Sequence, residues 1–362
     1  MCNCLLNILI KNQKMITFLD HNFSQLNAFI TENTFSKIFI LVDENTHEYC
    51  LPVLLGNLET EISFEILEVE PGEEMKNIQT VTQLWEILTE MQADRKALII
   101  NLGGGVITDM GGFIASTYKR GIQFINIPTT LLSMCDASIG GKTGIDLMHY
   151  KNMVGTFSFP EQILVYPQFL ETLPYKELRS GFAEMLKHGL IADKAHWENL
   201  IQIQKLDVEG ILPHIQTSMN IKQEVVDKDF HEKNIRKTLN FGHTIGHAIE
   251  SLCLAKENPI LHGEAVALGM ICETYLSYLE GLITVEDSEV IIENIQKYYS
   301  FVDLSQFEDK AIFELLLNDK KNIESRINFS LLSAIGSCVF DHQCTTENIQ
   351  KSLLFYKKLS GF

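Results

Sequence analysis

The stretch NLGGGVITDMGGFIAS, residues 101–116, follows an apolar run at residues 96–102 and opens a segment with helical periodicity. Three consecutive glycines between a strand and a helix let backbone N–H groups approach a pyrophosphate at the helix N-terminus, where the helix dipole favours negative charge. The spacing differs from the GxGxxG dinucleotide fingerprint, and taken alone the glycines fit a plain turn equally well. In this context they indicate a nucleotide-binding α/β domain.

The flanking sequence supplies the rest of such a domain. The apolar run at residues 37–43 is predicted to be a buried parallel strand, and further strands are predicted at residues 62–69, 122–127 and 163–166. The first delivers Asp43 and Asn45 into a loop, and strand ends of this kind bind ligands in open α/β sheets. A turn at residues 71–76 opens an amphipathic helix that runs to about residue 91. After residue 174 helical periodicity dominates. We therefore predict a Rossmann-like parallel-sheet domain over residues 1–173 and a mostly α-helical domain over residues 174–362.

Composition excludes several classes of function. A length of 362 residues favours two domains, and a net charge of −18 argues against a nucleic-acid surface, which requires clustered Lys and Arg. No apolar run approaches the ~20 residues of a membrane span. The eight cysteines are scattered and form no CxxC pair, which fits reduced thiols, most of them in the core. We expect a soluble, cytoplasmic protein that binds neither nucleic acid nor membranes.

Residues 236–250, RKTLNFGHTIGHAIE, concentrate polar chemistry in a helix-length segment. As one helix, it would place His243 and His247 on a common face, close to Arg236 and Asn240. Such a face makes a poor core, since buried polar groups need partners, so we predict a cavity for a metal, an anionic ligand or both. A lone histidine would more simply be a wet surface residue, but His262 follows nineteen residues after His243.

Two other segments carry candidate ligand groups. A predicted helix with Asp136 precedes a predicted loop at residues 140–144, and Lys142, Lys151 and Asn152 lie within eleven residues in glycine-rich surroundings. Their side chains can converge on one anion. Glu184 and Lys187 are three residues apart on a predicted helix and would alone indicate an ordinary salt bridge.

Together the motifs resemble the 3-dehydroquinate synthase family of the shikimate pathway. The resemblance rests on GGGVITD (103–109), KRG (119–121), PTT (128–130), SIGGKTGID (138–146), KN (151–152), FLETLP (169–174), RSGFAEMLKHG (179–189), LNFGHTIGHAIE (239–250), HGEAVALGM (262–270) and DKKN (319–322). It spans nearly all of the chain after about residue 40, whereas the first 35 residues carry nothing diagnostic.

The resemblance implies a site for zinc, or cobalt, made by Glu184, His243 and His262. It places His247, Asn152 and Lys320 at the substrate phosphate, and Lys142 and Arg236 at the substrate carboxylate. The rest of the pocket would be lined by Asp136, Lys187, Lys222, Glu232 and Asn240. Arg120 would reach the phosphate site of a neighbouring subunit, which implies a homodimer. NAD would contact Asp43, Asn45, Glu73, Lys76, Gly103, Gly104, Gly105, Val106, Asp109, Thr129, Thr130, Lys142, Lys151, Phe169, Thr172 and Leu173.

The implied activity is an NAD- and metal-dependent carbon–oxygen lyase reaction. A phosphorylated sugar acid, 3-deoxy-D-arabino-heptulosonate 7-phosphate, would cyclise to 3-dehydroquinate with loss of phosphate. Another sugar phosphate cyclase, of the inosose or valiolone synthase type, is disfavoured because Lys222, Arg236 and Asn240 are present. A metal-dependent polyol dehydrogenase would not need the phosphate-binding residues. A non-catalytic nucleotide-binding protein would not need the metal ligands.

Overall fold

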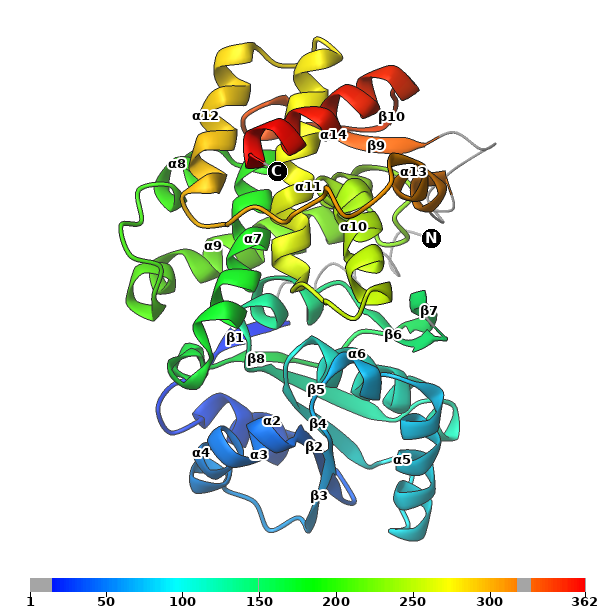
Figure 1. Cartoon of the computed structure of the whole chain (residues 1–362). Coiled ribbons are helices and arrows are strands. Elements are labelled where there is room, and N and C mark those ends of the chain that lie inside the picture. Colours follow the sequence, from blue (N-terminus) through cyan, green and yellow to red (C-terminus); the bar gives the residue numbers. More distant parts are fainter. Residues whose placement is uncertain (1–14, 149, 318–326, 362) are drawn as a thin grey trace, which may run out of the picture. The chain divides into compact units, whose positions relative to one another are not determined.

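The computed structural model describes residues 15–148, 150–317 and 327–361. The chain divides into two compact units, with the division between Pro174 and Tyr175. The first unit is coloured blue to green and the second green to red in Figure 1. Among the described helices, none combines the length and the apolar character needed to cross a membrane.

A six-stranded parallel sheet forms the centre of the first unit (Figure 1). Its order is β1-β8-β5-β4-β2-β3, and every neighbouring pair is parallel. The strands are β1 (Ile16–Phe18), β2 (Ile38–Asp43), β3 (Phe64–Val69), β4 (Leu98–Gly103), β5 (Gln123–Pro128) and β8 (Ile163–Val165). The predicted parallel sheet is confirmed, and its inner strands β2, β4, β5 and β8 are apolar because almost all of their side chains are buried on both faces.

Each face of the sheet packs on its own set of helices. Ile38, Ile40 and Val42 of β2 belong to one apolar core, with residues of α2 (Ser24–Glu32) and α4 (Leu51–Asn57). Phe39 and Leu41 belong to the other, with residues of α5 (Ile78–Glu90) and α6 (Gly105–Thr117). Successive side chains of β2 therefore point to opposite faces of the sheet and pack on the helices that cover each face. The short helix α3 (Glu44–Tyr49) follows β2 directly.

The strand order reverses between β2 and β4. From β2 the chain continues outward to β3, whereas from β4 it continues in the opposite direction to β5. Connections that diverge in this way leave a crevice at the carboxyl ends of the two strands, where open α/β sheets bind ligands. Asp43 ends β2 and Gly103 ends β4, so the glycine-rich stretch lies at this switch point.

The structure of residues 133–157 differs from the prediction of a helix followed by a loop. The segment with Asp136 is one turn of π-helix, η3 (Ser133–Ala137), and the predicted loop at residues 140–144 runs into a strand. β6 (Lys142–Leu147) and β7 (Tyr150–Phe157) form an antiparallel hairpin. The glycines suggested a loop, but Gly144 and Gly155 face each other so closely that a side chain on either would collide with the opposite backbone. Glycine here permits strand pairing.

The second unit is mostly helical, as predicted. Its helices are α7 (Tyr175–Ala192), α8 (Lys194–Leu200), α9 (Val208–Lys228), α10 (His243–Ala255), α11 (His262–Leu279), α12 (Val285–Gln296), α13 (Asp309–Leu317) and α14 (Thr346–Ser360). A hairpin of β9 (Asn328–Ala334) and β10 (Ser337–Gln343) joins them. Helix α11 contacts α7, α10, α12, α14 and β9, and its side chains are buried on nearly all sides. It is the central helix of this unit.

The prediction of one helix across residues 236–250 was wrong. A 3₁₀ segment, η5 (Ile235–Asn240), ends one residue before Phe241, and a separate helix, α10, begins at His243. The break is at Gly242, whose φ of 79° is a left-handed conformation that glycine adopts without strain. His243 and His247 therefore share a helix, but Arg236 and Asn240 lie on a separate segment.

Candidate metal and ligand site

Glu184 is the centre of the candidate site in the second unit. Its side chain is fully buried on α7. Its Oε1 lies 3.4 Å from Nε2 of His243 and 3.3 Å from Nε2 of His262. Both histidines are the first residues of their helices, α10 and α11. Three helices thus each deliver one potential ligand to the same point.

These distances fit a tetrahedral metal ion. Two donors that each lie about 2.0–2.1 Å from zinc are about 3.3–3.4 Å apart in tetrahedral geometry. The separations from Glu184 to both imidazoles match that value. Two nitrogens and one carboxylate oxygen also form the donor set of a catalytic zinc site, in which further positions stay open.

The protonation of His243 supports the same conclusion. Its Nδ1 lies 3.1 Å from the carbonyl oxygen of Phe241, which can only accept a hydrogen bond, so Nδ1 carries the proton. In the neutral ring Nε2 is then an acceptor that faces the carboxylate of Glu184. Two acceptors at this distance repel each other unless a proton or a metal ion lies between them.

The surroundings of His262 favour a positive charge. Its Nδ1 faces Glu250 Oε2 at 3.8 Å, and Glu250 is buried on α10. Burial lowers the pKa of His262, but the hydrogen bonds and charges of Glu184 and Glu250 outweigh it and raise the pKa to about 10. A site that holds a proton this strongly also attracts a cation. Sequence reasoning missed Glu250, although it closes the motif LNFGHTIGHAIE.

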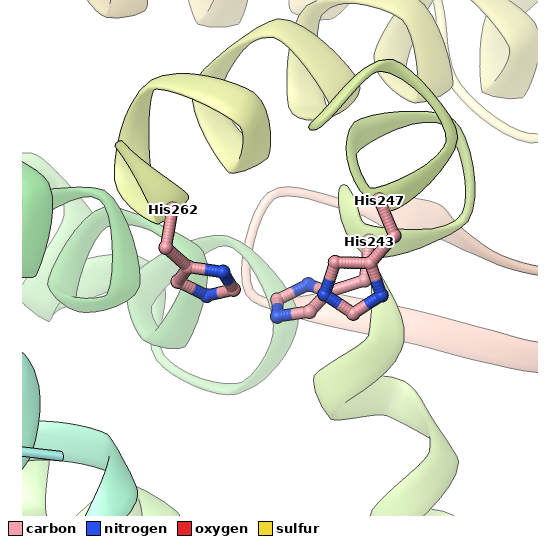
Figure 2. Close-up of side chains that lie close together, drawn as sticks. All are labelled: His243, His247 and His262. Carbon is pink, nitrogen blue, oxygen red and sulfur yellow. The ribbon is translucent and has the colours of Figure 1, made fainter. Parts of the chain in front are cut away.

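His247 lies beside the other two histidines. Figure 2 shows the three rings turned toward one another, His243 and His247 from α10 and His262 from α11. Potential ligand nitrogens of all three lie within 4.8 Å of one another. The ring centroids of His243 and His247 are 5.0 Å apart, and those of His247 and His262 are 5.7 Å apart. His247 therefore borders the candidate metal position.

The carboxylate of Glu184 is also held from its own helix. Lys187 Nζ forms an ion pair with Glu184 Oε2, and the lysine side chain is almost fully buried. The pair follows the predicted i,i+3 spacing. A buried ion pair needs good geometry and further polar contacts to compensate for lost hydration. Here the lysine holds one carboxylate oxygen while the other faces the histidines.

A further set of contacts fixes α7 against the start of α11. Arg179 Nη2 forms an ion pair with Glu264 Oε1, and Glu264 Oε2 accepts the backbone N–H of Leu261 at 3.0 Å. The N–H of Gly263 donates to Ser180 Oγ at 3.0 Å, and a Cβ at Gly263 would come within 2.0 Å of the Ser180 carbonyl oxygen. Helices α7 and α11 are therefore in direct contact at Gly263, where a side chain would not fit. This contact keeps Glu184 of α7 close to His262 of α11.

The loop before η5 gathers other predicted site residues. Asn240 donates to Glu232 Oε1 at 2.9 Å. Arg236 is buried, and its Nη1 donates to the carbonyl of Phe230 at 2.8 Å. Asp229 accepts backbone N–H groups of three later residues in this loop, including Arg236 at 3.1 Å. Burial raises the pKa of Asp229, but these hydrogen bonds and the Arg236 charge leave it below its ordinary value. Sequence reasoning missed this carboxylate.

In the first unit, the predicted glycine stretch lies where β4 meets α6. Gly104 caps α6, and within the described part of the chain no side-chain cap hydrogen bond is made there, an arrangement that suits a ligand at the first N–H groups of the helix. The N–H of Thr129 donates to the carbonyl of Gly103 at 3.0 Å, which brings the PTT turn to the same place. A Cβ at Gly104 would lie 3.0 Å from Thr130 Cγ2. Glycine there keeps space beside the threonine.

Lys76 connects several other residues of the predicted NAD set. Its Nζ lies 2.7 Å from Asp109 Oδ2, 2.7 Å from Asn152 Oδ1 and 3.8 Å from Glu73 Oε1. Burial would lower the pKa of Lys76, but Asp109 and Glu73 raise it, so the ammonium stays charged. Asp146, outside the predicted set, accepts the N–H of Asn152 at 2.7 Å.

The remaining predicted residues are distributed as follows. Asp43 caps α3 by accepting the N–H of Thr46 at 2.8 Å. Phe169 is buried in a core of the first unit, and Lys222 is buried on α9. Exposed side chains belong to Asn45, Arg120, Lys142, Lys151, Asn152 and Thr172. Val106, Thr130, Asp136 and Leu173 are partly buried, and Lys320 lies outside the described residues.

One further group of potential ligands lies away from this site. Glu280, His342 and Cys344 have ligand atoms within 4.8 Å of one another. Glu280 accepts from Asn348 Nδ2 at 2.9 Å, and its Oε2 lies 3.2 Å from His342 Nε2. Hydrogen bonds account for this grouping, which ties the end of α11 to β10 and α14.

Family models match most of the chain. The model for the N-terminal part of 3-dehydroquinate synthase matches residues 66–180, and the model for its C-terminal part matches residues 181–322. A 3-dehydroquinate synthase of Parabacteroides distasonis is 40% identical over 97% of this chain and 100% of its own length. One from Campylobacter concisus is 40% identical over 89% of this chain and 92% of its own length.

Solved structures share the whole fold. A 2-deoxy-scyllo-inosose synthase complexed with carbaglucose-6-phosphate, NAD+ and Co2+ has a TM-score of 0.82 at 26% identity, covering 93% of this chain and 95% of that one. A 2-epi-5-epi-valiolone synthase from Streptomyces hygroscopicus with NAD+ and Zn2+ has a TM-score of 0.79 at 25% identity, covering 96% and 97%. A probable glycerol dehydrogenase from Sinorhizobium meliloti, at 15% identity, shares the fold alone, with a TM-score of 0.65 and coverage of 96% and 97%.

Proposed function

The chain belongs to the 3-dehydroquinate synthase family, and from this premise we propose that it converts 3-deoxy-D-arabino-heptulosonate 7-phosphate into 3-dehydroquinate and phosphate. The reaction class is a carbon–oxygen lyase that eliminates phosphate and closes a carbocycle. The convergence of Glu184, His243 and His262 on one point, at separations that fit a metal ion, carries the proposal.

We propose that Glu184, His243 and His262 hold one divalent ion, zinc or cobalt. When bound, this ion acts as a Lewis acid that polarises and acidifies a substrate hydroxyl. Lys187 keeps the Glu184 carboxylate in place, and the Phe241 carbonyl keeps the His243 tautomer that leaves Nε2 as a ligand. His247 borders the site without belonging to the proposed ligand set, so it can contact the substrate phosphate.

We propose that the first unit binds NAD at the switch point between β2 and β4. NAD held there would supply reversible hydride transfer to and from the substrate, so it would not be consumed. The open N–H groups of α6 suit its pyrophosphate, and the Lys76–Asp109 pair holds a charged ammonium among the other predicted NAD residues. Asp136, Lys142 and Asn152 remain proposed substrate residues of this unit.

Arg236 supports a substrate that carries a carboxylate. A guanidinium presents a planar fork that suits bidentate pairing with a carboxylate. Arg236 is buried, and one of its nitrogens donates to Phe230. We propose that it orients the carboxylate of the sugar acid. Glu232 and Asn240, which lie near Arg236 in the sequence, form a hydrogen bond with each other.

The main alternatives are inosose and valiolone synthases, because solved members of those classes share the fold and bind NAD with Co2+ or Zn2+. The relatives named 3-dehydroquinate synthase are more similar in sequence, at 40% identity against 25–26%. A polyol dehydrogenase has support from fold alone.

The decisive experiment measures phosphate release by the pure protein. We expect release from the heptulosonate phosphate with sub-stoichiometric NAD, and little release from glucose 6-phosphate or sedoheptulose 7-phosphate. Equal turnover of the sugar phosphates that lack a carboxylate would assign the chain to another cyclase. Accumulation of NADH in proportion to product would indicate a dehydrogenase.

We also propose a cytoplasmic homodimer. Arg120 is exposed and lies on a turn with left-handed backbone at Lys119, Arg120 and Gly121. The cysteines Cys50, Cys253 and Cys272 are buried, and burial raises the pKa of each thiol, which fits inert core residues of a reducing compartment. Sedimentation that found a fully active monomer would refute the dimer.

A further inference from the structure

We infer that Glu273 is a positioning residue that sets the place of the metal ligand His243. Glu273 lies in the middle of α11, and its side chain is fully buried. Its Oε2 accepts the backbone N–H of Gly242 at 2.6 Å, and its Oε1 accepts the N–H of Ile245 at 3.0 Å. These two amides flank His243 in the chain, so one carboxylate holds the backbone on both sides of the ligand.

The two hydrogen bonds replace an ordinary helix cap. The first N–H groups of a helix need acceptors, which a Ser, Thr, Asp or Asn side chain at the N-cap often supplies. The N-cap of α10 is Gly242, which has no side chain to do so. Glu273 supplies the acceptors from another helix, and its negative charge lies where the dipole of α10 favours it.

Close packing transmits the position of α11 to the start of α10. Gly242, the N-cap of α10, and Gly246 within α10 both touch the α11 backbone: a Cβ at Gly246 would lie 2.7 Å from the carbonyl oxygen of Ala265. Because glycine has no side chain, the two backbones are in direct contact here. This contact and the hydrogen bonds to the carboxylate of Glu273 together restrict movement of the His243 backbone. Helix α11 therefore determines the positions of two proposed ligands: it carries His262, and through Glu273 it holds the backbone beside His243.

The type of residue argues for a role beyond packing. A buried carboxylate loses its hydration, and an apolar residue of similar size would avoid that cost. A carboxylate accepts two N–H groups with two strong, charge-assisted bonds, whereas an amide offers one acceptor oxygen and turns an NH₂ group toward the other N–H. Glu273→Gln is thus nearly isosteric and removes one of the two bonds.

The test measures zinc affinity of the full-length protein by competition with a chromophoric chelator. Residues that orient metal ligands typically change affinity by roughly 10- to 100-fold when substituted, and we expect a loss in that range for Glu273→Gln. The cobalt-substituted variant should show an altered d–d absorption spectrum, because the His243 ligand would be displaced. Zinc affinity and a cobalt spectrum equal to those of the parent would overturn the inference.

Two control variants separate positioning from general loss of stability. Thr274→Val changes the neighbouring residue, whose buried hydroxyl has no hydrogen-bond partner among the described residues. Ser352→Ala removes a buried hydrogen bond, 2.8 Å long, from α14 to the carbonyl of Cys272. Both variants should keep the zinc affinity of the parent. If Ser352→Ala weakened zinc binding as much as Glu273→Gln, the effect would reflect stability and the inference would fail.

A double-mutant cycle tests whether Glu273 acts through His243. In a His243→Ala background the weak residual zinc affinity should change by less than about twofold on adding Glu273→Gln, because the ligand that Glu273 positions is absent. An undiminished effect in that background would overturn the inference. If Glu273→Gln does not fold, Glu273→Asp, which keeps the charge but shortens the reach, enters the same cycle.

The inference rests on the proposed metal site, and the two can fail separately. Absence of zinc binding by the parent protein would refute the metal site itself. Zinc binding by the parent, lost in His243→Ala and unchanged in Glu273→Gln, would refute the role of Glu273 alone.

Discussion

Gly269 of α11 touches the backbone of Gly242 so closely that a Cβ added at Gly269 would lie 1.8 Å from the Gly242 carbonyl oxygen. Helices α10 and α11, which carry the two histidine ligands, therefore approach each other through glycine on both sides. The distance between His243 and His262 depends on this contact.

Gly269→Ala should separate the two helices. Relief of the collision requires the backbones to move apart, so we expect a loss of roughly 3 kcal/mol or more in the free energy of unfolding, together with weaker metal binding. Gly56→Ala is the control, because a Cβ there meets nothing within 4 Å and Gly56 lies in helix α4. Chemical denaturation should show the control variant unchanged or slightly more stable. Equal stability of both variants would contradict the contact.

His243→Ala should weaken metal binding so far that no ion remains after dialysis, and His247→Ala should preserve the bound ion. The protein should contain about one ion per chain in the parent and in His247→Ala, since three N/O ligands suffice for a catalytic site. Elemental analysis after dialysis measures the content. Because His247 lies within 4.8 Å of both other histidines, loss of the ion in His247→Ala would instead assign all three histidines as ligands.

Arg236→Ala should lower kcat/KM for the heptulosonate phosphate by about one to two orders of magnitude, the cost of roughly 1.5–3 kcal/mol for a lost charge-assisted contact. Arg236→Lys keeps the charge but removes the planar fork, so it should recover only part of the activity. Zinc content should stay at the level of the parent in both variants, which would show that the substitutions have not disrupted the metal site through the loop that Asp229 holds by hydrogen bonds. Full activity in Arg236→Ala would remove the argument for a carboxylate substrate.

Acid should destabilise the second unit partly through His196. This residue is 2% exposed on α8, and burial, aided by the charge of His214, lowers its pKa from 6.5 to about 4 against the opposing effect of Asp193. The stability that it contributes is complete above pH 6.5 and is lost as the pH falls toward 4, up to about 3 kcal/mol. His196→Leu should flatten unfolding free energy against pH in that window. The exposed His21→Leu should leave the profile as in the parent.

The sequence predicted much of this fold because strong local patterns coincide with tertiary burial. Five strands of the sheet were evident as apolar runs, and the histidines of the site were evident from their number and spacing. The strand β1, of three residues, is too short to leave a pattern. The break at Gly242 was missed because it depends on α11, which follows later in the chain.

Glu273 and Glu250 show what local patterns leave out. Both are buried carboxylates whose partners belong to another helix, so spacing along their own helix does not reveal them. A usable signal existed for Glu273, which is the only charged residue between Glu264 and Glu280 in an otherwise largely apolar segment. A charge in such a run is costly unless it has a partner.

The pairing of β1 with β8 has a practical consequence for protein production. Residues 16–18 cover the outer edge of β8, and Phe23 and Leu26 just beyond them are buried against the sheet. A shortened form designed from the sequence motifs alone, beginning near residue 35, would uncover both a row of unpaired backbone groups and an apolar surface. Such exposed edges recruit strands from other chains. We expect that form to accumulate in inclusion bodies, whereas the full-length chain should remain in solution.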